Sequence, residues 1–393
     1  MYRGHGVKYG SFLKDVFICS LGAYGGPEAH FSVFLDQMVV KKKYLTEEEL
    51  VELVALCSIL PGPTSTQALV SIGYKNGGPL LGFLTMIVWA LPVLMVMTAL
   101  SFLYQFLSFQ GISSGVLRFI GPMAVGFIIV AAFRIGRKVV KDIPTGALML
   151  FGAVTTFFIR APWIFPVVLL IGGAVTIFLS REKGIWNKIK LAPPWGYLFV
   201  FAVIAVLAIV LATVTDIRIF QLFESFYRYG YLVFGGGQVI VPVMHSELVE
   251  VRQYITNEEF LTGYGLVQGL PGPMFSFTAY AGGMAARDSG IFVQIMSAAV
   301  SGIGIFLPGV LLIYFVYPVW EELKQIKAVK ISLTGINAVA GGLIAVAAVI
   351  LMKASGFQIE NLIVTAVSVA LLMSRKVPAP LIVVAAILGG VFV

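Results

Sequence analysis

Long apolar stretches recur along the chain and limit what it can fold into. Of the 393 residues, 59% are hydrophobic and 12% are charged, which is about half the charged share of an average soluble domain. The stretches are about 17 to 25 residues long, the length that a helix needs to cross a hydrocarbon layer about 30 Å thick. Because lipid offers the backbone no hydrogen-bond partners, such segments must be helical. The sequence therefore predicts an all-α polytopic membrane protein.

About thirteen apolar segments are expected to span the membrane. Their approximate bounds are 12–40, 46–74, 78–109, 116–136, 143–160, 163–180, 196–214, 219–248, 257–285, 290–318, 332–352, 358–374 and 377–393.

The chain contains an internal repeat. A shift of 210 positions aligns Tyr24 to Gly73 with Phe234 to Gly283 without a gap, and 14 of these 50 positions are identical. A shift of about 216 then pairs Leu91-Pro92 with Leu307-Pro308. Gene duplication explains the pattern, and three parts are predicted. They are an N-terminal transporter repeat (1–190), a linking transmembrane helix (191–216) and a C-terminal transporter repeat (217–393).

The number of segments predicts how the halves are oriented. Each half has six apolar segments and one more lies between them, so equivalent helices are separated by seven crossings. An odd number reverses direction, which predicts two six-helix repeats of inverted topology, provided that every segment spans. With the N-terminus in the cytoplasm, 18 of the 27 basic residues fall on the cytoplasmic side, as the positive-inside rule requires. The cluster Lys41 to Lys43 is an exception that the sequence does not explain.

Two kinds of helix break occur in both halves. The first is Gly25-Gly26-Pro27, matched by Gly235-Gly236-Gly237, and the second is Pro61-Gly62-Pro63, matched by Pro271-Gly272-Pro273. Proline removes a backbone donor and glycine permits unusual backbone angles, so neither triplet favours an intact helix. Broken backbone at membrane depth requires protein or water around it, which favours a transport pathway. The alternative is a kink or a site of close helix packing.

A helix that restarts after a break offers unpaired N–H groups and its positive dipole end to an anion. Thr64, Ser65 and Thr66 add hydroxyl donors directly after the first Pro-Gly-Pro, whereas Met274 and Ser276 follow the second one. If the halves pack about a pseudo-two-fold axis, the breaks meet near the membrane midplane. We then expect an oxyanion to sit between two positive helix ends.

Ionisable and polar residues near the breaks extend this hypothesis. Glu28 follows the first break within an apolar segment, where charges are expensive and usually functional. It is either a proton-coupling carboxylate, since the second half has the neutral Gln238, or a carboxylate satisfied by the helix N-terminus. His30 either titrates near neutral pH or is hydrogen-bonded between helices. Gln67 either joins helices or lines a cavity.

Arg228 has two interpretations. It attracts the anion from the helix before the second Gly-rich break, or it forms an ordinary helical ion pair with Glu224 four residues earlier.

The sequence predicts no metal, no catalytic residues and no cofactor. His5, His30 and His245 lack the spacing of a zinc site, and no phosphate-binding loop for ATP is present. A membrane gradient must therefore supply the energy.

The motifs carry a family resemblance. Tyr24-Gly25-Gly26-Pro27-Glu28-Ala29-His30, then Leu60-Pro61-Gly62-Pro63-Thr64, and a second copy of both breaks resemble the two-domain chromate ion transporter family. The resemblance implies a multi-pass protein of the bacterial plasma (inner) membrane that moves chromate, usually outward for resistance, with sulfate as the related competitor. It carries over only to the matching break positions and to His30. Tyr24 stands where the family usually has Phe, and Gly237 replaces the proline in the second copy.

The resulting hypothesis is secondary active transport of chromate or a similar tetrahedral oxyanion, with the N-terminus cytoplasmic. A sulfate or other oxyanion uptake carrier is the alternative, and an integral-membrane enzyme acting on lipid headgroups has less support because no acidic metal cluster or nucleophile is found. The lipid bilayer is the expected partner, nucleic acid is not, and a homodimer is left open. The candidate substrate-binding residues are Gly25, Gly26, Pro27, Glu28, His30, Pro61, Gly62, Pro63, Thr64, Ser65, Thr66, Gln67, Gly235, Gly236, Gly237, Gln238, Pro271, Gly272, Pro273, Met274 and Ser276.

Overall fold

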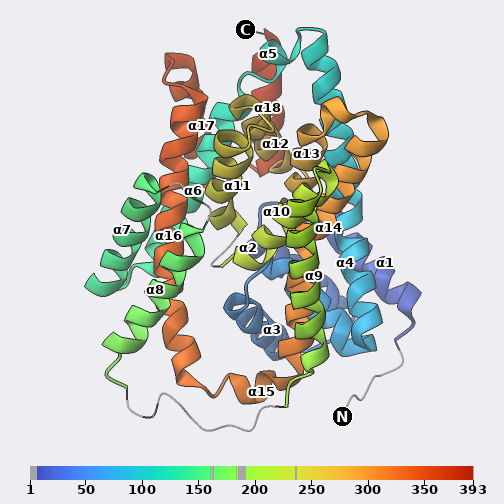
Figure 1. Cartoon of the computed structure of the whole chain (residues 1–393), viewed down its shortest axis with the longest axis vertical. Helices are drawn as coiled ribbons and strands as arrows, with labels where there is room; N and C mark the ends of the chain where they lie inside the picture. The colour runs from blue at the N-terminus through green and yellow to red at the C-terminus, as the bar shows by residue number, and fades with distance from the viewer. Residues whose placement is uncertain are drawn as a thin grey trace. The chain divides into compact units, whose positions relative to one another are not determined.

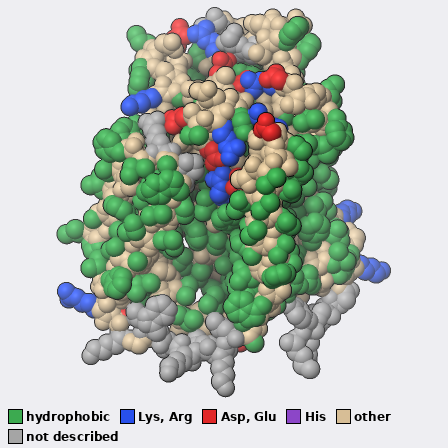
Figure 2. All heavy atoms as spheres, viewed as in Figure 1, with side chains coloured by type: hydrophobic (Ala, Val, Ile, Leu, Met, Phe, Trp, Pro, Cys, Tyr) green, Lys and Arg blue, Asp and Glu red, His purple; other side chains and the backbone are tan. Residues whose placement is uncertain are grey.

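A computed structural model describes residues 7–159, 161, 163–182, 184, 192–234 and 237–392, apart from the side chains of 27, 28, 113 and 114. Within these ranges every regular element is a helix (Figure 1). Five of the described helices are long and apolar enough to cross a membrane: Thr64–Phe109, Ile120–Val139, Trp195–Val214, Ile291–Leu323 and Lys327–Ser355. Hydrophobic side chains cover most of the face in Figure 2. The prediction of an all-helical polytopic membrane protein is confirmed at this level.

The helices fall into two compact units, each of which draws on both halves of the sequence. Unit 1 comprises Met1–Ala99, Ile189–Gly236 and Leu270–Leu323, and unit 2 comprises Leu100–Lys188, Gly237–Gly269 and Lys324–Val393. Unit 1 holds α1 (Tyr9–Gly22), α2 (Pro27–Phe34), η1 (Leu35–Lys41), α3 (Glu47–Ile59), most of α4 (Thr64–Phe109), α9 (Trp195–Val214), α10 (Arg218–Leu232), η4 (Met274–Ser276), α13 (Phe277–Ala285), η5 (Arg287–Ser289), α14 (Ile291–Val316), η6 (Tyr317–Val319) and α15 (Trp320–Leu323). Unit 2 holds the end of α4, α5 (Ser113–Val116), α6 (Ile120–Val139), α7 (Ile143–Phe158), α8 (Ile164–Leu179), η2 (Gly237–Ile240), α11 (Val241–His245), η3 (Ser246–Val251), α12 (Asn257–Val267), α16 (Lys327–Ser355), α17 (Ile359–Ser374) and α18 (Ala379–Phe392).

The first predicted segment, 12–40, is a hairpin. The buried carboxylate of Asp15 on α1 accepts hydrogen bonds from Gln37 (3.2 Å) and Tyr44 (2.7 Å) and pairs with Lys42 at 3.0 Å. The ring of Phe12 packs edge-on against Tyr44, with the centroids 4.9 Å apart. The start of α1 thus lies beside the end of η1, and the chain must reverse between them at the Gly-Gly break.

The Tyr44 hydroxyl that closes this hairpin stays protonated at neutral pH. Burial, followed by the hydrogen bond to Asp15, raises the pKa of Tyr44 to about 12.

The second predicted segment, 46–74, also folds back on itself. Glu49 at the start of α3 forms an ion pair with Lys75, near the end of the first part of α4. Leu53 of α3 and Leu69 of α4 share one buried hydrophobic cluster. The Pro-Gly-Pro break at 61–63 therefore forms the tip of a second hairpin.

Helix α4 is itself two antiparallel arms, residues 64–76 and 79–109. Trp89 donates a hydrogen bond to Thr66 at 3.1 Å, although 23 residues of straight helix would separate them by about 35 Å. The chain reverses at Gly77 and Gly78, whose backbone angles are not helical, with φ of −157° and 73°. The residue that follows is Pro79, which suits the start of a new helix.

These contacts correct the predicted topology of the N-terminal region. Segments 12–40 and 46–74 were expected to span, but each is a helical hairpin. With 14 residues, α1 is about 21 Å long, which is shorter than the roughly 30 Å hydrocarbon layer. The sequence signal failed because a Gly-Gly-Pro or Pro-Gly-Pro triplet is compatible with a kink as well as with a full reversal.

The repeat is visible in local structure. Thr46 with Glu49 and Thr256 with Glu259 form equivalent capping boxes at the starts of α3 and α12. Each is preceded by a π-helix, η1 or η3. Between π-helix and capping box, Lys43 and its counterpart Gln253 both adopt positive φ, at 55° and 51°. The two copies of the repeat have therefore kept similar local backbone conformations.

The second arm of α4 and its sequence equivalent α14 pack antiparallel within unit 1. Gly82 lies against Tyr314 and Gly302 against Leu94, so residues early in one helix meet residues late in the other. Tyr314 also donates a 2.6 Å hydrogen bond to the Pro79 carbonyl at the start of the arm.

Unit 2 is built on close contacts between small residues. Helix α16 packs on α7 and α8, where Gly335 lies against the Gly172 backbone and Gly342 against the Met149 carbonyl. Any Cβ at Gly335 would lie only 1.9 Å from the Gly172 oxygen. Such small-residue contacts let membrane helices approach closely.

The first hairpin makes a testable topological prediction. Lys8→Cys and Glu47→Cys, introduced singly after Cys19 and Cys57 are replaced by alanine, should react with an impermeant maleimide from the same side of the membrane. A segment 12–40 that crossed once would place the two labels on opposite sides.

The buried carboxylate makes a stability prediction. Asp15→Ala leaves the Tyr44, Gln37 and Lys42 donors without their acceptor, so it should lower the free energy of unfolding by about 2 to 3 kcal/mol. Asp36→Ala is the matched control, because its pair with Lys41 is more than half exposed and worth about 1 kcal/mol at most. Thermal unfolding of purified protein in detergent measures both, and equal effects would contradict the prediction.

Candidate functional site

The breaks of the two halves exchange backbone hydrogen bonds inside unit 1. The N–H of Gly62 donates to the carbonyl of Val233, and the N–H of Gly272 donates to the carbonyl of Ala23, both at 2.8 Å. Gly62 and Gly272 are repeat equivalents, as are Ala23 and Val233. Each Pro-Gly-Pro break is thus bonded to the chain just before the Gly-rich break of the other half. The meeting of the two Pro-Gly-Pro breaks with each other stays a prediction.

The polar residues after the first Pro-Gly-Pro form a buried network. His30 Nδ1 and Ser65 Oγ are 3.0 Å apart, and Trp89 donates to Thr66 Oγ1. The indole also packs edge-on against the imidazole, with centroids 5.4 Å apart. His30 is therefore hydrogen-bonded between helices, which was one of its two predicted interpretations. Thr64, at the first position of the helix, is half-buried.

Gln67 ties the first break to α14. Its Nε2 donates to the Pro61 carbonyl at 2.8 Å and to the Gly309 carbonyl at 3.4 Å. The side chain is buried, and among the described residues its Oε1 has no hydrogen-bond partner. Gln67 thus joins helices with its nitrogen and leaves its oxygen unused.

The residues that follow the second Pro-Gly-Pro are more apolar than those that follow the first. Met274, Phe275 and Ser276 replace Thr64, Ser65 and Thr66, and a short 3₁₀ turn precedes α13. The hydroxyl of Ser276 is buried and makes no hydrogen bond to any described residue. The two breaks therefore share a backbone plan but differ in side-chain chemistry.

Some of the remaining candidate residues are described by the structure and others are not. Gly25 and Gly26 adopt positive φ of 86° and 90°, so both need glycine. Gly235 and Gly236, together with the side chains of Pro27 and Glu28, lie outside the described residues. Gly237 and Gln238 begin η2 in unit 2.

Arg228 forms the ordinary ion pair. Its Nε lies 2.6 Å from Glu224 Oε1 and its Nη2 lies 3.2 Å from Oε2. The alternative, a cation held ready for the anion, is not favoured by this bidentate contact.

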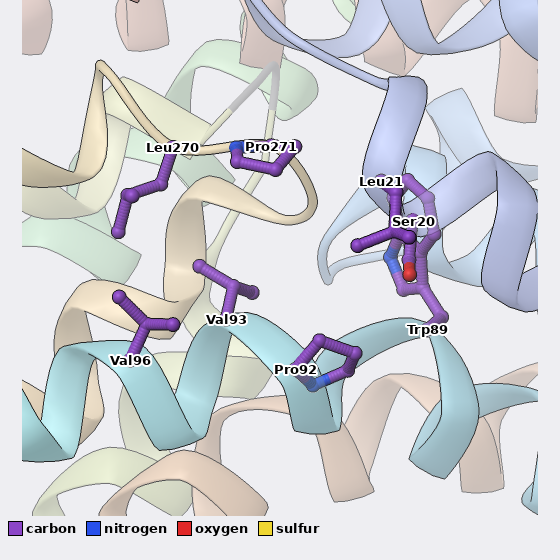
Figure 3. A pocket seen from close by; sticks show the side chains of 8 residues that line it. All are labelled: Ser20, Leu21, Trp89, Pro92, Val93, Val96, Leu270 and Pro271. Atoms are coloured by element: carbon purple, nitrogen blue, oxygen red, sulfur yellow. The ribbon is translucent and has the colours of Figure 1, made fainter.

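A small apolar pocket lies between the two half-repeats of unit 1 (Figure 3). Its volume is about 70 Å³, and its lining residues are Ser20, Leu21, Trp89, Pro92, Val93, Val96, Leu270 and Pro271. At the equivalent place in the second half, Gly230 packs directly on Ile305 and Pro308. Trp89 thus has one face toward this pocket and its N–H toward Thr66.

Comparison with known proteins decides the family. The chromate transporter family matches residues 11–178 and 220–391, one match in each half. The chain belongs to the chromate transporter family. It is therefore a transporter and not an enzyme, as the sequence motifs had suggested.

Relatives within the chromate transporter family match over nearly the whole chain. A probable chromate transport protein of Synechococcus elongatus is 25% identical, with 95% of this chain and 93% of the relative covered. Chromate transport proteins of Cupriavidus metallidurans and Pseudomonas aeruginosa are 25% and 26% identical, covering 93% and 91% of this chain and 88% and 83% of their own lengths. No solved structure matches the chain.

Sequence reasoning missed three contributors to this transporter's break region. Trp89 was not singled out among the residues of its apolar segment. A tryptophan three residues before Pro92 at membrane depth could have indicated a functional position. The carbonyls of Ala23 and Val233 act through the backbone, so no side-chain pattern could have found them.

The first break makes a prediction about glycine. Gly62 has φ of 131°, and a Cβ there would lie 2.5 Å from Gln67 Nε2, so Gly62→Ala should cost about 2 kcal/mol or more of stability. Gly10→Ala is the control, because nothing lies within 4 Å of its Cβ position and alanine favours a helix. Thermal unfolding of both variants checks this, and an unchanged midpoint for Gly62→Ala would contradict it.

Proposed function

We propose that this protein carries chromate, or a closely similar tetrahedral oxyanion, across the bacterial plasma membrane by secondary active transport, in the outward direction that gives resistance. The main support is the pair of reciprocal hydrogen bonds from Gly62 to Val233 and from Gly272 to Ala23, which joins the breaks of both halves. Membership of the chromate transporter family supplies the substrate class.

The anion would bind at the N-terminus of the first arm of α4. The helix bonds there begin with the Gln67 N–H, which donates to Pro63, so the preceding N–H groups have no partner within the helix. These groups, the positive helix end and the hydroxyls of Thr64, Ser65 and Thr66 suit an oxyanion without a buried lysine. The second break would complete the site mainly through its backbone.

An inverted repeat is the topology that we propose. It is supported by the antiparallel packing of α4 on its equivalent α14. The two hairpins of the first half precede the second arm of α4, so they leave the seven predicted crossings between this arm and α14 unchanged. Between the starts of the two repeats they reduce seven crossings to five, which is also an odd number. The inversion therefore does not depend on segments 12–40 and 46–74 being spans.

The hairpins also account for Lys41, Lys42 and Lys43. If the N-terminus is cytoplasmic, a first segment that folds back returns this cluster to the cytoplasmic side. The exception to the positive-inside rule then disappears. The repeat halves 1–190 and 217–393, with a linker between them, stay the proposed domain division.

Glu28 is our candidate for proton coupling. It follows the Gly-Gly break in the first half only, because Gln238 stands at the equivalent position. A neutral glutamine cannot carry a proton through the cycle, so one coupling site per chain is expected.

Flux measurements in proteoliposomes test this function. Wild-type protein should move radiolabelled chromate in response to an imposed gradient. Thr64→Ala should raise the concentration for half-maximal flux about fivefold, since one hydrogen bond is worth about 1 kcal/mol. Thr213→Ala, exposed on α9, is the control and should behave as wild type.

The same assay tests coupling and the rival substrate. Glu28→Gln should abolish the response to a pH gradient, and full pH-driven transport by this variant would refute the coupling role. Sulfate transport without chromate transport would replace the proposed function by oxyanion uptake.

A further inference from the structure

The unused oxygen of Gln67 has a fixed chemical character. The amide nitrogen of Gln67 donates hydrogen bonds to two backbone carbonyl oxygens, those of Pro61 and Gly309. Only the NH₂ end can face them, so the amide cannot be flipped. Oε1 is therefore an acceptor, buried in a side chain that is 1% exposed, with no described partner.

An acceptor at this place is unexpected for a simple anion site. Gln67 lies in the first turn of a helix whose preceding N–H groups and hydroxyls are donors. A fully ionised tetrahedral oxyanion offers only acceptors, so it would match the donors but oppose Oε1. A singly protonated oxyanion offers three acceptor oxygens and one O–H donor, and it satisfies both kinds of group.

We propose that the first break binds the singly protonated form of the oxyanion, with its O–H donated to Gln67 Oε1, and that this contact discriminates hydrogen chromate from sulfate. The inference rests on the proposed function. Chromate takes up a proton close to neutral pH, whereas sulfate stays fully ionised, so the two anions differ in this one donor despite their similar shape and charge. An unpaired buried acceptor is costly, so sulfate pays a penalty that hydrogen chromate avoids.

The arrangement is specific to one half. The equivalent of Gln67 is Phe277, which follows Met274, Phe275 and Ser276. The position equivalent to Gln67 in the second break thus has no hydrogen-bond acceptor in its side chain. One selective site per chain follows.

Access to Oε1 requires the break to open. Gly62 lies against the Gln67 amide and is held by its hydrogen bond to Val233. Parting of this contact would let the anion reach Oε1, and separation of half-repeats is what alternating access demands.

Among the described side chains, few titratable groups lie near Gln67, and the side chain of Glu28 on α2 is not among those described. His30 on α2 reaches the same helix turn through Ser65, and the Glu224 to Arg228 pair lies on α10 before Val233. Lys75 and its partner Glu49 lie at the far end of the hairpin. Helix α14, which supplies Gly309, contains no charged residue. A proton taken up by any of these groups would alter the binding of chromate and sulfate alike, so sulfate is the internal control.

Equilibrium binding of the two anions to purified full-length protein, measured between pH 6 and 8, is the test. The apparent Kd of wild type for total chromate should fall as the pH falls, by up to about tenfold per unit where the protonated form is scarce. The Kd for sulfate should stay constant. A chromate Kd that does not change with pH, or that changes in parallel with that of sulfate, would overturn the inference without any variant.

Substitutions sharpen the test. Gln67→Met removes the acceptor, together with the amide donor to Pro61 and Gly309, with little change in volume. It should reduce the preference for chromate over sulfate about tenfold, which corresponds to 1.4 kcal/mol. Gln294→Met, at an equally buried glutamine of α14, should leave the preference unchanged. An unchanged preference in Gln67→Met refutes the proton contact while chromate binding stands, whereas a wild type that binds no chromate refutes the proposed function itself.

Discussion

Backbone amides at broken helices must find partners, and in this protein they find them in the other half of the chain. A glycine between two prolines has neither an intact helix nor water to satisfy its N–H at membrane depth. The bonds from Gly62 to Val233 and from Gly272 to Ala23 meet this demand reciprocally. One hydrogen bond of this kind contributes about 1 kcal/mol, so the two together stabilise the joint between the halves only modestly.

The pseudo-symmetry of the backbone contrasts with the asymmetry of the side chains. Capping boxes, π-helices and residues of positive φ recur at equivalent positions. Around the first break, His30, Ser65, Thr66, Gln67 and Trp89 form a polar network. Around the second, the equivalents are mostly apolar. Duplication supplied a scaffold in which each Pro-Gly-Pro break is bonded to the other half, and divergence left the polar side chains mainly at the first of them.

Part of this organisation was predictable from residues alone. The repeat, the position of the breaks and the ion pair of Glu224 with Arg228 follow from spacing, because each depends on neighbours in sequence. The reversal of 12–40 did not, since it is fixed by Asp15 meeting Lys42 and Tyr44 across the hairpin. Only part of the candidate site could be predicted from the sequence, for the same reason. Thr64, Ser65 and Thr66 were predicted as donors after a proline, and Gln67 as a residue that joins helices or lines a cavity. The unpaired oxygen of Gln67 could not be predicted, because it depends on Gly309, which is 242 residues away.

The ion pair at the base of the first hairpin has a mechanical consequence. Asp15 and Lys42 stand on opposite arms, so any sliding of α1 along η1 must separate charges that are hidden from solvent on the carboxylate side. In the second half the lysine has become Arg252, and its carboxylate, Glu247, lies five residues away in the same segment. That pair joins two residues within one stretch of chain, whereas the pair of Asp15 with Lys42 joins two arms of a hairpin. Duplicated elements can thus keep a similar backbone while their ion pairs brace different parts of the chain.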